Sequence, residues 1–204
     1  FGPARKSPSM FFQPNSGAVR PTRLLQALLL AMLLAGFSIH AHAQFAVNSG
    51  QSKLAGGLLS TSAQLTLKIT GDPAQALSKG IGLTIVVQTR LYRASLASWY
   101  FKVASWERRF RVEHHALSNR YTLTQVATGT TDDFPTLTET LSAIGRFATT
   151  VDLPAGTHEN DDLQMRLQVS LDRKSLPGPL KLVALIFKDW QLRSSWGRWK
   201  VKTR

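Results

Sequence analysis

The stretch that decides the fold class is LQMRLQVSL, from Leu163 to Leu171. Apolar and polar side chains alternate here without a break. Successive side chains of a β-strand point to opposite faces of a sheet, so this alternation places one face in the core and the other in solvent. The stretch therefore predicts a half-buried strand over residues 163–171.

The same two-residue period recurs along the chain and predicts further strands. Leu65, Leu67 and Ile69 alternate with polar residues. Apolar residues at the odd positions of 83–91 share one strand face, and so do those at the even positions of 106–112. Residues 182–187 are apolar at every position, which favours a strand buried on both faces.

Two segments carry the signals of short helices instead. Residues 72–80 begin with Asp-Pro and end at Gly80, a start and a stop that suit a helix. A second helix is expected after Asp133-Phe134-Pro135, because Leu137, Leu141 and Ile144 recur on one helical face. Two helices are too few for a parallel α/β fold, so we predict a mainly β protein, an antiparallel β-sandwich with two short helices.

The N-terminal part resembles an export signal. Arg20 and Arg23 precede an apolar run over residues 24–36, and Ala41-His42-Ala43 supplies small residues for cleavage. The run is shorter than the roughly 20 residues of a spanning helix. We expect residues 1–43 to contain a cleaved secretory signal peptide and residues 44–204 to form a single β-rich periplasmic domain. A retained inner-membrane anchor is the alternative.

The chain is strongly basic, with 25 Lys and Arg against 12 Asp and Glu. Four of these basic residues and none of the acids precede residue 44, so the expected domain carries 21 basic residues and a formal charge of +9. Such a charge attracts anionic partners. Export argues against nucleic acid, which leaves anionic lipid, envelope polysaccharide or an acidic protein. A charge that serves only solubility is the alternative.

Known catalytic motifs do not occur in the sequence. It has no Gly-x-Ser-x-Gly elbow, no Gly-rich phosphate loop and no Cys. His114 and His115 are neighbours that would point to opposite faces of a strand. His158 and Asp161 lie in a polar stretch without the spacing of a zinc or calcium site. We predict no enzyme activity, no cofactor and no metal, and an enzyme alternative would rest on His158 and Asp161.

Basic and aromatic residues cluster in two places, residues 90–101 and residues 190–202. This composition is found in binding hot spots and at membrane interfaces. Arg108 adds an arginine to an otherwise apolar strand face, where it needs a partner, a route to solvent or a ligand. Aromatic side chains that plug the ends of the core are the alternative. The candidate binding residues are Arg93, Trp99, Tyr100, Arg108, Trp196, Arg198 and Trp199.

Several segments in matching order, spread over residues 54–200, are similar to domain-of-unknown-function family four-three-nine-zero, a set of short exported bacterial proteins. They include 76–83, 91–93, 106–111, 115–121, Asp189-Trp190 and Ser195-Trp196. The resemblance implies export and a β-rich fold and supplies no activity. Members are often encoded beside a membrane sensor histidine kinase, which implies such a kinase as a partner.

These observations favour a non-enzymatic periplasmic binding or interaction module whose partner is an envelope protein such as a sensor kinase. The alternative is a peripheral binder of anionic lipid or envelope polysaccharide, which would use a basic surface rich in Trp and Arg.

Overall fold

In the computed structural model, the residues described are 2, 44–94, 99–158 and 160–203. All but the first belong to the compact unit Ala43–Arg204. The predicted signal peptide and its apolar run lie outside the described residues. No helix within the described part of the chain has the length and apolar character needed to cross a membrane.

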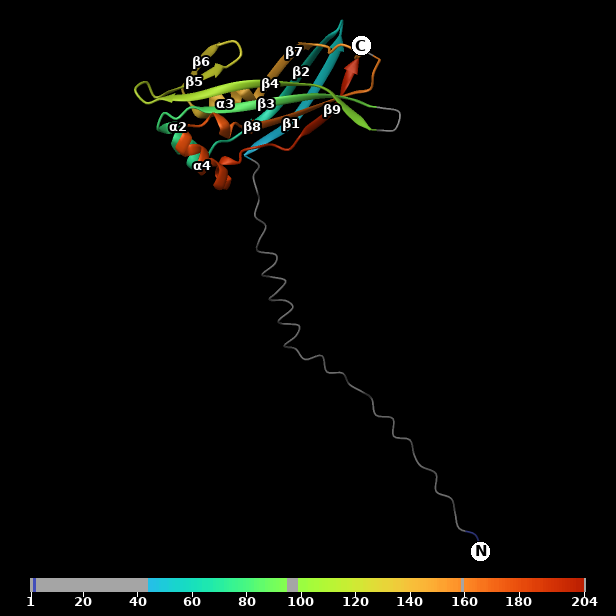
Figure 1. The fold of residues 1–204 in the computed structure, drawn as a ribbon. Coiled ribbons are helices and arrows are strands. Elements are labelled where there is room, and N and C mark those ends of the chain that lie inside the picture. The colour runs from blue at the N-terminus through green and yellow to red at the C-terminus, as the bar shows by residue number, and fades with distance from the viewer. Residues whose placement is uncertain (1, 3–43, 95–98, 159, 204) are drawn as a thin grey trace. The chain divides into compact units, whose positions relative to one another are not determined.

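Nine strands form one curled sheet (Figure 1), in the order β6-β5-β4-β3-β8-β9-β1-β2-β7. The mainly β class is therefore confirmed, and the predicted strand over residues 163–171 is β8. The strands are β1 (Phe45–Ala55), β2 (Leu58–Leu67), β3 (Leu83–Ala94), β4 (Tyr100–His115), β5 (Arg120–Gln125), β6 (Thr131–Phe134), β7 (Arg146–Asp152), β8 (Leu163–Leu171) and β9 (Gly197–Thr203).

The last strand, β9, makes the sheet continuous. It pairs antiparallel with β8 on one side and parallel with β1 on the other. The other pairs of neighbouring strands are antiparallel. The sequence predicted two stacked sheets, but β9 hydrogen-bonds to both groups of strands and joins them edge to edge. The result is a mixed, half-barrel sheet in place of a sandwich.

The core lies on the concave side of this curled sheet. Phe45 and Leu65 from the β1–β2 half pack in one cluster with Val87 and Leu167 from the β3–β8 half. A second cluster, which includes Leu91 and Met165, continues the core along the sheet. Both halves therefore contribute to one core. On each strand, the side chains at the alternate positions that do not enter this core point outward, to the convex face.

Both predicted helices are present, as α2 (Gly71–Ser78) and α3 (Leu137–Gly145). The hydroxyl of Thr136 caps α3 by accepting a hydrogen bond from the Glu139 amide over 3.2 Å. The predicted strand over residues 182–187 is wrong, because the chain forms a third helix there, α4 (Gly178–Ile186). Pro179 favours this helix start, and a run that is apolar throughout has no period that separates strand from helix.

Two 3₁₀ turns flank α4. They are η1 (Arg173–Ser175) and η2 (Lys188–Trp190). Trp190 ends η2 with only 1% of its surface exposed and joins the main core. Trp190 therefore plugs this end of the core, and η2 holds α4 and α2 beside each other at one end of the sheet.

Candidate functional site

Three arginines lie side by side on the convex face, one from each of three neighbouring strands. Arg90 on β3 is directly opposite Arg166 on β8, and Arg166 is directly opposite Arg198 on β9. Directly opposed residues of paired strands point to the same face of a sheet. Neighbouring strands are about 4.8 Å apart, so the three Cα positions span about 10 Å. We call Arg90, Arg166 and Arg198 the arginine row.

Aromatic rings support two of these guanidinium groups. Arg90 lies over the ring of Trp196, 4.5 Å from its centroid, and Arg166 lies over the ring of Tyr92 at 4.1 Å. An arginine above an aromatic face is attracted by the ring and held flat against it. The rings therefore orient the guanidinium groups without neutralising their charge.

The hydrogen-bond partners of the row are also neutral. Arg90 donates from Nη2 to Gln88 Oε1, and Arg166 donates from Nε to Gln164 Oε1, both over 2.9 Å. Within the described residues, no carboxylate forms an ion pair with the row. The nearby Lys200 has its own acid, since its ammonium lies 3.4 Å from a carboxylate oxygen of Asp162.

One buried donor in the row has no hydrogen-bond partner among the described residues. The Nε atom of Arg90 is buried and makes no hydrogen bond within the described part of the chain. An unsatisfied buried donor costs free energy, and so do like charges on directly opposed residues. A row of three arginines with like charges on directly opposed residues is chemically suited to an anion, which would screen those charges.

The basic face continues from the row toward the other half of the sheet. Lys202 lies four residues after Arg198 on β9, so its side chain points to the same face of the sheet. It is directly opposite Lys53 on the parallel strand β1. These two lysines line a hollow of about 420 Å³.

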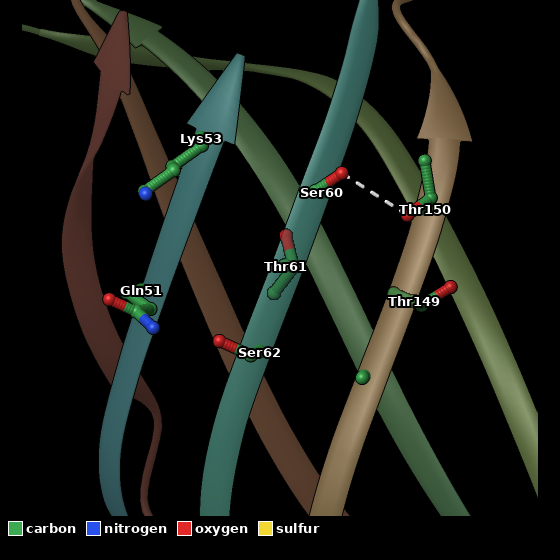
Figure 2. A pocket seen from close by; sticks show the side chains of 8 residues that line it. Gln51, Lys53, Ser60, Thr61, Ser62, Thr149 and Thr150 are labelled. Atoms are coloured by element: carbon green, nitrogen blue, oxygen red, sulfur yellow. Dashed lines mark hydrogen bonds between the residues drawn. The ribbon is translucent and has the colours of Figure 1, made fainter. Parts of the chain in front are cut away.

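Next to it, Figure 2 shows a second hollow, of about 260 Å³, over β1, β2 and β7. Its polar lining is mainly uncharged, with the amide of Gln51 and the hydroxyls of Ser60, Ser62 and Thr150. Ser60 and Thr150 share a hydrogen bond of 3.2 Å. Charged and uncharged hydrogen-bonding groups therefore lie next to each other on the convex face.

The predicted residues at the C-terminal end separate into two faces. Trp196 and Arg198 lie with the arginine row on the convex side. Trp199 points inward, where its Nε1 donates to the Ser52 hydroxyl over 2.9 Å and its ring packs against both core clusters. A Cβ added at Gly50 would overlap that ring. Trp199 therefore plugs the core.

The other predicted residues do not form one site. Arg108 lies half-buried on the concave side, where its Nη2 donates to the Thr149 hydroxyl over 3.3 Å. Arg93 donates to the Gly156 carbonyl over 2.9 Å and pairs with Asp161 at 3.4 Å. Trp99 is 71% exposed, and Tyr100 is half-buried.

His158 and Asp161, the residues of the enzyme alternative, form a small turn. The His158 amide donates to Asp161 Oδ2 over 2.9 Å. That hydrogen bond, followed by the charge and hydrogen bond of Arg93, lowers the pKa of Asp161, although burial opposes the shift. The carboxylate is thus held ionised in a structural role. The described residues contain no group of three or more side chains suited to a metal ion.

Sequence reasoning missed Arg90 and Arg166. Each occupies a polar position of an alternating strand, which is the usual place for a solvated arginine. Only the register of β3, β8 and β9 brings them beside Arg198, and the register depends on pairing between distant segments. The sequence signal was limited to the recurrence of arginine at outward positions.

Comparison with known proteins gives a family and no further relative. A family model described as "Domain of unknown function (DUF4390)" matches residues 42–200. No curated protein and no solved structure matches the chain. The family match covers most of the chain and confirms the family predicted from its segments. The chain belongs to the DUF4390 family of domains of unknown function.

Proposed function

We propose that this domain is a non-enzymatic binding module of the cell envelope that holds an acidic polysaccharide on its convex face. The observation that carries the proposal is the arginine row, whose three charges form no ion pair with a carboxylate within the described residues. The envelope location rests on the export signal expected in residues 1–43.

Carboxylates are the groups that the row suits best. An arginine can donate two parallel hydrogen bonds to one carboxylate, and such charge-assisted bonds are stronger than neutral ones. A chain with a carboxylate on successive units could contact several arginines at once.

The uncharged groups beside the lysines favour a polysaccharide over other acidic ligands. Amide and hydroxyl side chains both donate and accept hydrogen bonds, as sugar hydroxyls do. Gln51, Ser60 and Ser62 present such groups on the convex face (Figure 2). A polymer that crosses from the row to this hollow would meet arginines first and hydroxyls later.

The test is calorimetric titration of the full chain with alginate, a polysaccharide with a carboxylate on every sugar, against neutral dextran. We expect alginate to bind, dextran not to bind, and the double variant Arg166→Gln/Arg198→Gln to lose at least about tenfold in affinity.

The matched control is Lys174→Gln/Lys181→Gln, which removes two exposed charges away from the row. The control should bind alginate as the parent does. Equal losses in both variants would show attraction by net charge alone and would overturn the site.

A protein partner, such as the sensor kinase implied by the family resemblance, is a second candidate. The observation that favours it is the exposure of two large aromatic side chains, Trp99 at 71% and Phe101 at 61%. In-cell crosslinking should recover a membrane protein that is lost with Trp99→Ala/Phe101→Ala. The control is Leu117→Ala, a change at another fully exposed apolar residue. If the aromatic variant still recovers the same membrane protein, Trp99 and Phe101 are excluded as the contact surface.

A further inference from the structure

The helix α4 exposes an apolar face that the proposed polysaccharide site does not use. Leu182, Leu185 and Ile186 are 66%, 61% and 75% exposed, and Phe187 just after the helix is 53% exposed. The first three recur at i, i+3 and i+4, so they share one face. The opposite face is anchored, since Ala184 is fully buried. A contiguous patch of large apolar side chains marks an interaction surface.

Basic side chains surround this patch. Residues 173–188 contain four basic residues and no acid, and the exposed Asp189 follows Lys188. Three of them, Lys174, Lys181 and Lys188, are exposed. The fourth, Arg173, is turned inward and donates to the Ala184 carbonyl at 3.1 Å, which fixes α4 to η1. Exposed leucines bordered by lysines are the pattern of helices that lie in the surface of an anionic membrane.

The start of the domain lies at the same end of the sheet. Gln44 precedes β1; its carbonyl accepts a hydrogen bond from the Lys68 amide, and its side chain donates to the Thr70 hydroxyl over 3.0 Å. The next residue, Gly71, begins α2, which packs against η2 beside α4. In Figure 1, β1 begins at the end where α2 and α4 lie.

This placement relates α4 to the apolar run of the sequence. Seven residues, 37–43, separate the end of that run at Gly36 from Gln44. Seven residues reach at most about 25 Å. In the alternative of a retained inner-membrane anchor, residues 24–36 would keep the α4 end of the domain within reach of that membrane.

From these observations we propose that α4 docks on a membrane of anionic phospholipid. Leu182, Leu185 and Ile186 enter the boundary between headgroups and acyl chains, and the lysines contact the phosphates. The helix is short and fixed to the core on its other face, so it lies on the membrane and does not span it. The partner is a lipid surface, and its recognition needs apolar insertion together with negative charge.

The absence of cysteine from the chain permits a local test. A single environment-sensitive fluorophore is attached to the full chain at Leu185→Cys or, as a control, at Leu58→Cys. Leu58 is also exposed, at 48%, but starts β2 where that strand pairs with the end of β1. The label reports its own surroundings, so vesicle binding through residues 1–43 does not by itself change it.

We expect vesicles of phosphatidylglycerol and phosphatidylethanolamine to shift the emission of the label at 185 to the blue, with no shift at 58. Vesicles of phosphatidylcholine alone should give a much weaker response. Lys181→Gln/Lys188→Gln should weaken the response at 185 about 30-fold in lipid concentration. Arg166→Gln/Arg198→Gln should leave it unchanged, which separates this proposal from the polysaccharide site.

Three results would overturn the proposal. One is no response at 185 to anionic vesicles, and another is an equal response at 185 and 58. The third is a shift at 185 that depends on protein concentration without vesicles and does not increase with lipid, which would assign the face to a second copy of the chain.

Discussion

Arg108 on β4 donates a hydrogen bond to the hydroxyl of Thr149 on β7 over 3.3 Å. Five strands separate β4 from β7 in the sheet order, so this bond crosses the concave side and does not follow the sheet. It is a direct link between the two halves of the half-barrel. The bond also accounts for an arginine on an otherwise apolar strand face, where the guanidinium has found a neutral oxygen.

A double-mutant cycle tests this link. Arg108→Met keeps most of the apolar stem and removes the donor, and Thr149→Val removes the acceptor. Each change should lower the free energy of unfolding by about 1 kcal/mol, with a coupling of similar size. Urea denaturation of the parent, the two single variants and the double variant measures the individual effects and the coupling.

The control is the exposed pair of Arg111 and Glu113, which lies within β4 and links no two strands. Its coupling should be about 0.5 kcal/mol or less. Zero coupling between residues 108 and 149 would show that the bond does not hold the halves together.

Gly50 is predicted to be essential for packing, because a Cβ there would overlap the Trp199 ring. Gly50→Ala should destabilise the chain by about 1–3 kcal/mol through overpacking. Gly178→Ala is the matched control, since open space surrounds that position. Differential scanning calorimetry should show a lower Tm for the first variant only. An unchanged Tm for Gly50→Ala would mean that the ring can move aside.

The turn at Asp161 gives a pH-dependent stability. The lowered pKa means that the folded state holds the carboxylate ionised more readily than the unfolded chain does. Its contribution is complete above the ordinary value of 3.8 and is lost as pH falls through the lowered pKa. Asp161→Asn should therefore lower Tm at neutral pH and converge with the parent only as the pH falls below 3.8, through the lowered pKa.

Asp152→Asn is the control for that experiment, since Asp152 is exposed and forms no ion pair within the described part of the chain. Its effect on Tm should be small at both ends of the range. A constant difference between Asp161→Asn and the parent at every pH would contradict the role given to the carboxylate.

In the arginine row, a change that weakens binding should make the folded protein more stable. Arg198→Gln removes one of three like charges and should raise the free energy of unfolding by about 0.5 kcal/mol at low salt. The same change should weaken alginate binding. Lys174→Gln, outside the strands, should do neither. Chemical denaturation with and without salt measures the first effect, and a loss of stability in Arg198→Gln would show that the arginine has a favourable partner.

Local patterns predicted much of the fold. The alternation of residues 163–171 gave β8 with its buried face correct, and the Asp-Pro start with a Gly stop located α2 to within two residues. Such signals are contained within one element, so no knowledge of its neighbours is needed. The run at 182–187 failed for the opposite reason, because its side chains carry no contrast between faces.

The candidate site was less predictable, because it depends on register. Trp196 and Trp199 are three residues apart in the same basic segment, yet one supports Arg90 outside and the other fills the core. The composition of the segment does not distinguish the two tryptophans. The pairing of β9 with β8 determines which one points inward. Together with the pairing of β3 with β8, it assembles the arginine row, in which Arg90 and Arg198 are more than a hundred positions apart in the chain.

The role of β9 has a consequence for the timing of folding. The strand that joins the β3–β8 half to the β1–β2 half is made from residues 197–203 and follows the other eight strands of the described sheet in the sequence. A chain that leaves a ribosome or a translocation channel with its N-terminus first cannot complete this sheet until residues 197–203 emerge. The nascent protein thus stays open until then, and a premature stop codon before residue 197 would leave two sheets with unpaired edges, a form prone to aggregate.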